Sequence, residues 1–199
     1  MNLAAVIVQA GGTGARLGGA SKPDYLVGGR RLLDVFFAEL AAAGFAGVSI
    51  VVAPGEVAVP PGAIRTLEDP PHGGPLAGIS AGLAQLEGLP DSALVGLGAC
   101  DAPLSPRLFP ALAARLDRND DRDLPLSLID GAIPAAAEGN HRYLHGVYRL
   151  GALRKLELVR HGAIRSVFSI LKLSAVEDPH DWCFDVDTPE EAEALAARL

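Results

Sequence analysis

Short apolar runs alternate with amphipathic segments over the first half of this 199-residue chain, and this alternation constrains the fold more than any other feature. Runs that are apolar almost throughout predict strands buried on both faces of a sheet; they lie at 3–9, 48–53, 64–67 and 93–99. Apolar residues at helical spacing predict helices between them, at 31–43 and 76–86. Strands that alternate with helices indicate βαβ units, and therefore a mostly parallel sheet in a single α/β domain over 1–199.

The second half of the chain is less regular. Ser105-Pro106 predicts the start of a helix, because serine is a favourable N-cap and proline fits the first helical position. Thr188 and Glu191 form a capping-box pattern around Pro189 and predict a final helix. Short strands are expected at 124–129, 133–137, 145–149 and 172–176.

Composition and charge narrow the function classes. Hydrophobic residues make up 49% of the chain and charged residues 21%, which excludes disorder as the main state. A net charge of −7 argues against a general nucleic-acid binder but allows an anionic ligand in a locally positive pocket. No apolar run reaches the ~20 residues of a membrane span, and the N-terminal run lacks the basic segment of a signal peptide. Cys100 and Cys183 cannot form a disulfide framework, so we expect a cytoplasmic protein.

A glycine-rich loop follows the first expected strand and is rich in features that suit phosphate. It contains Gly11, Gly12, Thr13, Gly14, Arg16, Gly18 and Gly19, with Lys22 just beyond. Glycines let backbone N–H groups wrap an anion, and the two cations add positive charge. The dinucleotide-binding pattern G-x-G-x-x-G does not match, because it would require a glycine where Leu17 stands. The Walker A pattern does not match, because it would require a lysine directly after Gly19, where Ala20 stands. A flexible surface loop is the alternative; the cation pair after a buried strand favours a phosphate cradle.

Two acidic positions are candidate metal ligands. Asp101 follows an apolar strand directly, where ligands of parallel sheets bind, and Mg²⁺ needs only one or two carboxylates besides phosphates and water. The alternative is that Asp101 caps the next turn. Asp185 and Asp187 would lie on the same face of a strand, so either could supply the second carboxylate. Asp187 could instead belong to the cap of the last helix.

Two further patterns look like parts of catalytic or metal sites but lack the context that such sites require. Residues 78–82 match the G-x-S-x-G pattern of serine hydrolases, but that motif needs a preceding strand, and here Pro70, Pro71 and Pro75 precede it. Apolar spacing places Ser80 inside a helix. His141 and His145 lack a suitably spaced zinc partner and are interpreted as facing solvent or substrate. The two cysteines are expected to be ordinary buried residues.

Together these motifs resemble the MobA family of molybdenum cofactor guanylyltransferases, within the GT-A-like nucleotidyltransferases. The family's glycine-rich opening matches residues 9–22, its acid and G-P-L-A-G match Glu68-Asp69 and residues 74–78, its C-D-x-P matches residues 100–103, and its last motif matches residues 185–191. The four motifs occur in the family's order. Gln9 departs from the family's usual Leu, and Asp185 and Asp187 from its usual Asn pair.

The resemblance implies a fold, a reaction and a set of residues. The fold would be a three-layer, Rossmann-like domain of GT-A type, with nucleotide bound by about 1–105 and acceptor by about 106–187. GMP would pass from GTP to the phosphate of molybdopterin, releasing pyrophosphate, with Mg²⁺ as cofactor and Mn²⁺ compatible with the same oxygen ligands. Arg16, Lys22 and Asp101 would be catalytic, and Asp101 and Asp187 would hold the metal. The implied nucleotide-binding residues are Gln9, Ala10, Gly11, Gly12, Thr13, Gly14, Arg16, Lys22, Asp69, Gly74 and Asp101.

Other functions stay open at this point. Residues 145–149 and 165–167 loosely match the segments that form the acceptor site in the family. The resemblance is also compatible with transient contact with proteins that handle the molybdenum cofactor. Aspartates like Asp185 and Asp187 also occur in this motif of cytidylyltransferases that act on the same cofactor. The motif therefore does not decide between guanine and cytosine as the nucleobase. A nucleotidyltransferase for another sugar or small-molecule phosphate, a non-catalytic nucleotide-binding relative and, least favoured, a serine hydrolase are the alternatives. We expect no nucleic-acid or membrane partner.

Overall fold

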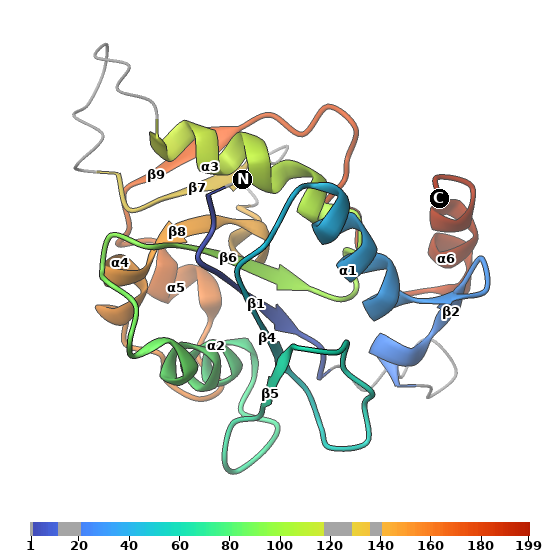
Figure 1. Cartoon of the computed structure of the whole chain (residues 1–199), viewed down its shortest axis with the longest axis horizontal. Coiled ribbons are helices and arrows are strands. Elements are labelled where there is room, and N and C mark those ends of the chain that lie inside the picture. Colours follow the sequence, from blue (N-terminus) through green and yellow to red (C-terminus); the bar gives the residue numbers. More distant parts are fainter. Residues whose placement is uncertain (1, 12–20, 118–128, 136–140) are drawn as a thin grey trace.

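The computed structural model describes residues 2–11, 21–117, 129–135 and 141–199 (Figure 1). At its centre lies a seven-stranded sheet in the order β5-β4-β1-β6-β8-β7-β9. Its strands are β1 (Ala5–Gln9), β4 (Val48–Val52), β5 (Ile64–Thr66), β6 (Leu94–Ala99), β7 (Gly131–Pro134), β8 (Val147–Arg149) and β9 (Leu173–Val176). All pairings are parallel except the two made by β8. The carboxyl ends of β1, β4 and β6 therefore meet at one edge.

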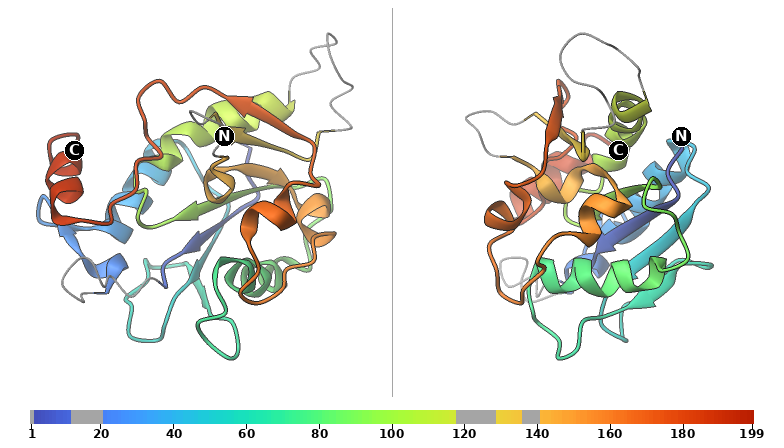
Figure 2. Two further views of the ribbon diagram at one scale, coloured as in Figure 1. Left: turned by 180° about the vertical axis from the view of Figure 1, so that it is seen from behind. Right: turned by 90° about the vertical axis from the view of Figure 1, so that its left-hand side faces the viewer.

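Helices cover both faces of this sheet, as Figures 1 and 2 show. The helices α1 (Leu32–Ala42) and α3 (Phe109–Asp117) pack on one face, and α2 (Pro75–Leu83), α4 (Leu150–Arg154) and α5 (Ile164–Phe168) on the other. Alternation along β1 sorts its side chains between the two cores: Val6 and Val8 join the first, Ala5 and Ile7 the second. The expected three-layer α/β arrangement is confirmed.

Two glycines of α2 let this helix approach β1 closely. A Cβ atom at Gly82 would lie 2.6 Å from Cγ2 of Ile7, and one at Gly78 would lie 2.4 Å from Oε1 of Gln9. Both glycines lie on the same face of the helix because they are four residues apart. The close approach places the first turn of α2 beside the carboxyl end of β1, where the expected site lies.

A small third core joins the C-terminal helix α6 (Pro189–Ala196) to the hairpin of β2 (Leu26–Val27) and β3 (Arg30–Arg31). The predicted capping box is present: the Glu191 amide donates to the Thr188 hydroxyl, and the Glu191 carboxylate accepts the Thr188 amide. Val186 belongs to this core, and its amide donates to the carbonyl of Asp101 over 2.8 Å. This bond holds the segment before α6 next to the end of β6.

The second half departs from the sequence-based expectations in several places. The strand expected at 145–149 begins only at Val147, because Tyr143–His145 forms a 3-10 helix. The helix predicted at Ser105 begins as a 3-10 turn over Ser105–Leu108 before α3. Residues 185–187 are not in a strand, so the period-two argument for them was wrong. Parts of the strands expected at 124–129 and 133–137 fall outside the described residues.

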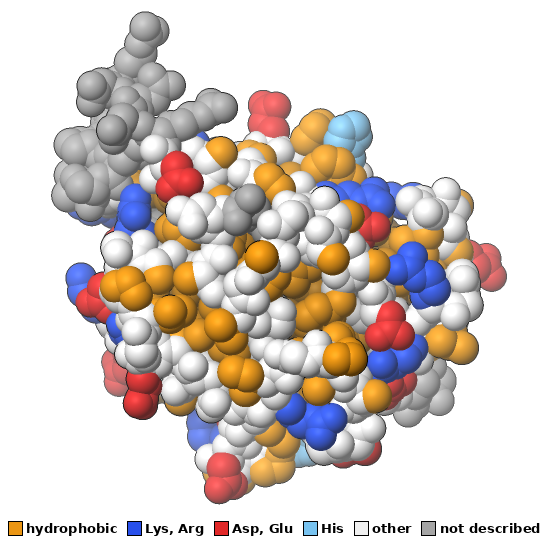
Figure 3. All heavy atoms as spheres, viewed as in Figure 1, with side chains coloured by type: hydrophobic (Ala, Val, Ile, Leu, Met, Phe, Trp, Pro, Cys, Tyr) orange, Lys and Arg blue, Asp and Glu red, His pale blue; other side chains and the backbone are white. Residues whose placement is uncertain are grey.

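The face of the molecule drawn in Figure 3 carries charges of both signs. Basic and acidic side chains are interspersed around its rim, with apolar side chains between them. The described side chains of this face therefore form no broad patch of one charge that could bind a polyanion. None of the described helices combines the length and apolarity that a membrane crossing requires.

Candidate active site

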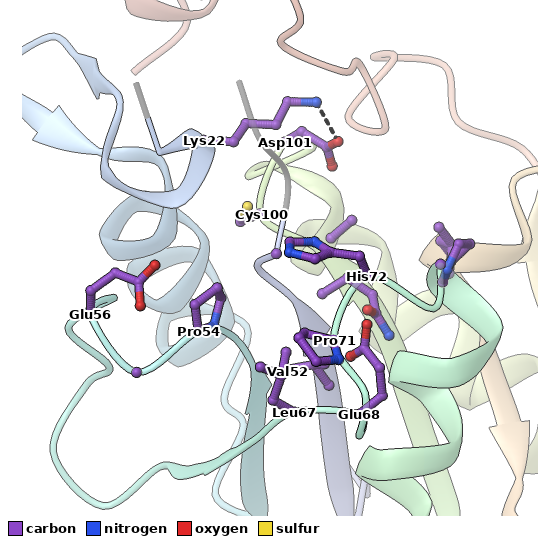
Figure 4. A pocket seen from close by; sticks show the side chains of 17 residues that line it. Lys22, Val52, Pro54, Glu56, Leu67, Glu68, Pro71, His72, Cys100 and Asp101 are labelled. Atoms are coloured by element: carbon purple, nitrogen blue, oxygen red, sulfur yellow. Dashed lines mark hydrogen bonds and ion pairs between the residues drawn. The ribbon is translucent and has the colours of Figure 1, made fainter. Parts of the chain in front are cut away.

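A cavity of about 610 Å³ opens at the carboxyl ends of β1, β4 and β6. Figure 4 shows Lys22 and Asp101 at one end of it and Leu67 and Glu68 at the other. Gln9, the last residue of β1, also lines this cavity, and so do apolar side chains such as Val52, Pro71, Pro75 and Leu144. A charged end and a partly apolar end suit a ligand that has both a polyanionic and a planar part.

Lys22 links two carboxylates at the charged end. Its Nζ lies 2.7 Å from Oδ2 of Asp101 and 2.5 Å from Oδ1 of Asp187. Burial alone would lower the pKa of Lys22, but the charge of Asp101 and the hydrogen bonds with Asp101 and Asp187 outweigh it and raise the pKa. The ammonium therefore stays charged at neutral pH.

The same two carboxylates fit a divalent cation. Both reach one position, now taken by the ammonium, and Oδ1 of Asp101 is buried with no hydrogen-bond partner in the described parts of the chain. No group of three or more His, Cys, Asp or Glu side chains arranged for a metal occurs among the described residues. Two carboxylates could hold a Mg²⁺ ion whose other ligands are substrate phosphates and water.

Asp185 and Asp187 have different surroundings. Asp185 lies 3.6 Å from Nε2 of His145 and 3.9 Å from Nη1 of Arg142. Burial would raise the pKa of Asp185, but the nearby side chains of His145, Arg142 and Lys22 lower it overall. The backbone amide of Asp187 donates to Glu191 in the cap of α6, while its carboxylate contacts Lys22. Asp187 thus takes part in the cap of α6 through its backbone, while its carboxylate is positioned as a candidate second metal ligand.

The other end of the cavity contains a carboxylate that sequence reasoning missed. Glu68 lines the cavity, and its Oε1 accepts the amide N–H of Gly73 over 3.0 Å. Its neighbour Asp69, one of the expected nucleotide-binding residues, lines a second cavity of about 420 Å³, which Glu68 also borders. Gly74 lines the large cavity with a φ of 81°, a conformation that glycine adopts without strain. The dipeptide Glu68-Asp69 was the signal, but a sequence does not say which of its side chains turns inward.

Other predicted residues divide into three groups. Gln9, Gly11, Lys22, Gly74 and Asp101 all line the large cavity. Ala10 is buried beside them, with its amide donating to Val52 in the sheet. Gly12, Thr13, Gly14 and Arg16 lie outside the described residues.

Ser80 and the two cysteines behave as predicted, whereas His145 is buried and does not face solvent. Ser80 lies inside α2, without the preceding strand that a nucleophile elbow requires. Cys100 and Cys183 are free and buried, and burial raises the pKa of both thiols. Neither thiol is therefore an activated nucleophile.

The fold and this site are those of a nucleotidyltransferase, and comparison with known proteins assigns the family. Residues 6–176 match the model of the MobA-like NTP transferase domain, and the chain belongs to this family. It is 30% identical to a molybdenum cofactor guanylyltransferase of Bradyrhizobium sp. (strain ORS 278), over 96% of this chain and 92% of that protein.

Solved structures support the same fold. The chain superposes on molybdopterin-guanine dinucleotide biosynthesis protein A of Archaeoglobus fulgidus with a TM-score of 0.69 and 19% identity, covering 98% of this chain and 100% of the other. It also superposes on 2-C-methyl-D-erythritol 4-phosphate cytidylyltransferase of Thermus thermophilus, with a TM-score of 0.64, 21% identity and coverage of 98% and 99%. At these identities the match concerns the fold alone.

Proposed function

We propose that this enzyme transfers GMP from GTP to the terminal phosphate of molybdopterin and releases pyrophosphate. The observation that carries the proposal is the convergence of Asp101, Asp187 and Lys22 at one end of a cavity whose other end has apolar walls and a carboxylate. The first end suits the triphosphate and the second suits a base. The guanylyltransferase relative from Bradyrhizobium supports guanine and molybdopterin as the substrates.

The chain's own residues would act by positioning and by charge. Asp101 and Asp187 would hold Mg²⁺, which would neutralise charge on the triphosphate. Lys22 would exchange its carboxylate partners for phosphate oxygens, a role we also assign to Arg16 and to the backbone of Gly11, Gly12, Thr13 and Gly14. Fixed positive charge aimed at the phosphates stabilises the charge that develops in phosphoryl transfer.

The reaction needs no protein nucleophile. An oxygen of the acceptor phosphate forms a bond to the α-phosphorus, and the bond from that phosphorus to the bridging oxygen breaks in line. Pyrophosphate leaves with the electron pair. A phosphate acceptor is already ionised at neutral pH, so no general base has to remove a proton. In this scheme the residues of the site align the two reactants.

The acceptor belongs to the second part of the chain in this proposal, about 106–187. His145 lies beside Asp185 near the charged end, and Arg165 borders a separate cavity of about 320 Å³ together with His141 and Tyr143. Arg149 belongs to the segment 145–149 that loosely matches the acceptor site. Its side chain donates to the carbonyls of Ile129 and Leu116, so we assign it a structural role next to the sheet. We assign the protein to the cytoplasm, where free thiols stay reduced.

A cytidylyltransferase on the same cofactor is the second candidate, favoured by the aspartates at 185 and 187. The test is turnover: purified enzyme, molybdopterin, Mg²⁺ and either GTP or CTP, with pyrophosphate and the dinucleotide product measured. Product from GTP that needs both molybdopterin and Mg²⁺ supports the proposal. Product from CTP alone favours the second candidate, and no product from either contradicts both.

A further inference from the structure

The side chain of Gln9 presents an amide whose hydrogen-bonding capacity is not used within the described parts of the protein. Gln9 ends β1, in register between Val52 of β4 and Ala99 of β6. Its Nε2 is buried and has no hydrogen-bond partner among the described residues, although the side chain borders the large cavity. Burying an unpaired amide is unfavourable, so such a group requires an explanation, and an incoming ligand is one.

The first turn of α2 holds this amide in place. A Cβ atom at Gly78 would lie 2.4 Å from Oε1 of Gln9 and 3.0 Å from its Nε2. Only a glycine leaves room for the glutamine at this point, and the amide is packed between β1 and the helix. The packing limits the orientations of the amide, so a ligand that reaches the Gln9 side chain would meet a donor already held in place.

Glu68 supplies the complementary acceptor. Its carboxylate borders the same cavity and is oriented by the Gly73 amide over 3.0 Å. A carboxylate has about four acceptor positions, so this one bond leaves capacity for a ligand. Val52 and Pro71 add apolar surface against which the faces of a planar ring can pack.

We infer that Gln9 selects the nucleobase, its amide N–H donating to O6 of guanine while the Glu68 carboxylate accepts from guanine N1–H and N2–H₂. This inference rests on the proposed function. Adenine carries an amino group at the position of O6, so the Gln9 donor would face another donor. Its N1 is unprotonated, so the Glu68 carboxylate would face another acceptor. Cytosine offers a single amino group to Glu68, where guanine offers two donors.

The test measures binding by calorimetry with Mg²⁺ present and no acceptor, so that no transfer occurs. The probes are GTP, 6-thioguanosine triphosphate, in which a weaker acceptor replaces O6, and inosine triphosphate, which lacks the 2-amino group. We expect wild type to bind GTP about tenfold more tightly than the 6-thio analogue. Gln9→Met should lose about tenfold in GTP affinity and bind both alike, and Glu68→Gln should lose the preference for GTP over inosine triphosphate.

A control and a second readout separate recognition from structure. Gln85→Met changes an exposed glutamine that does not border the large cavity, and its affinities should equal those of wild type. Because Nε2 of Gln9 has no partner among the described residues of the ligand-free protein, Gln9→Met should unfold at the same temperature as wild type or higher. A glutamine with a purely structural role would give a lower unfolding temperature.

The outcomes distinguish this inference from the proposed function. If wild type binds GTP but Gln9→Met keeps the full preference over the 6-thio analogue, the inference is wrong and the proposed function stands. Tighter binding of CTP than of GTP by wild type also overturns the assignment to guanine. If wild type binds none of the triphosphates, the proposed function fails and the inference fails with it.

Discussion

At the scale of single residues, Asp101 is the position where the site is most sensitive to charge. It bonds to Lys22 and has a second, buried oxygen without a partner in the described structure. Asp101→Asn keeps the shape but removes the charge that would hold Mg²⁺. We expect kcat/KM to fall by about 10²–10³, the size of losing one preorganised charge contact in a transition state.

The measurement is initial-rate kinetics over a range of Mg²⁺ concentrations. Asp91→Asn is the matched control, because Asp91 forms an exposed ion pair with Arg154 outside the large cavity. This control should keep wild-type rates. An Asp101→Asn enzyme with the wild-type rate and Mg²⁺ dependence would remove Asp101 from the proposed metal site.

The residue types of the site could be predicted from the sequence, but their orientations could not. Glu68 and Asp69 are adjacent acids, and only Glu68 borders the large cavity. Asp185 and Asp187 were expected to share a face, yet one contacts His145 and the other Lys22. These orientations depend on loop conformations that are fixed by distant contacts, such as the bond from Val186 to Asp101. Period-two alternation holds only inside a strand.

At the scale of elements, the contact between α2 and β1 can be tested with a glycine. Replacing a helical glycine by alanine normally stabilises a helix by about 1 kcal/mol. At Gly82 the added Cβ would lie 2.6 Å from Cγ2 of Ile7, so we expect Gly82→Ala to lower the free energy of unfolding by about 1–3 kcal/mol. Denaturant unfolding measures this change.

Gly88→Ala is the matched control for Gly82→Ala. A Cβ at Gly88 would meet no atom within 4 Å, so the stability should change by less than about 0.5 kcal/mol. If Gly82→Ala proved as stable as this control, the close packing of α2 on β1 would be refuted.

A second element-scale prediction concerns the loop that forms the base end of the cavity. Arg160 donates to the carbonyls of Pro70 and Pro71, and the His161 amide donates to the Gly73 carbonyl over 2.7 Å. Arg160→Ala should loosen this loop and raise KM for GTP about tenfold, with little change in kcat, because the chemistry occurs at the opposite end.

Steady-state kinetics with saturating acceptor tests the Arg160 prediction. Arg154→Ala is the control, since Arg154 donates to the carbonyls of Leu86 and Glu87, which do not border the large cavity. A fall in kcat for Arg160→Ala with KM unchanged would show that the arginine acts in some other way than by shaping the base end.

The first half of the fold could be predicted better than the second for a physical reason. Buried parallel strands are apolar throughout, so β1, β4 and β6 stand out in the sequence. The strands β7, β8 and β9 are short, and β8 reverses direction between parallel neighbours. Their pairing depends on long-range contacts, which local periodicity does not encode.

At the scale of the whole molecule, the proposed substrates are acidic and so is the chain. Such a chain can bind them only where positive charge is concentrated locally. The net charge is −7, yet a partly buried lysine lies at one end of the large cavity. Two carboxylates pair with this lysine in the absence of ligand, so these three described side chains together present a net negative charge to a free triphosphate. Binding of the triphosphate should therefore depend strongly on an added divalent cation.

This dependence gives a prediction for the stability of the folded chain. A ligand that binds only the native state stabilises it by about 2.7 kcal/mol at a hundred times its Kd, which corresponds to about 5–10 °C in Tm for a chain of this size. We expect this shift with GTP and Mg²⁺ together, and a much smaller one with GTP and EDTA, because the charges of Asp101 and Asp187 then stay uncompensated. Thermal unfolding measures it, with ATP and Mg²⁺ as the control for base selection. An equal shift with EDTA would mean that Lys22 and the glycine-rich loop bind the triphosphate without a metal, and that the two carboxylates serve to hold the lysine.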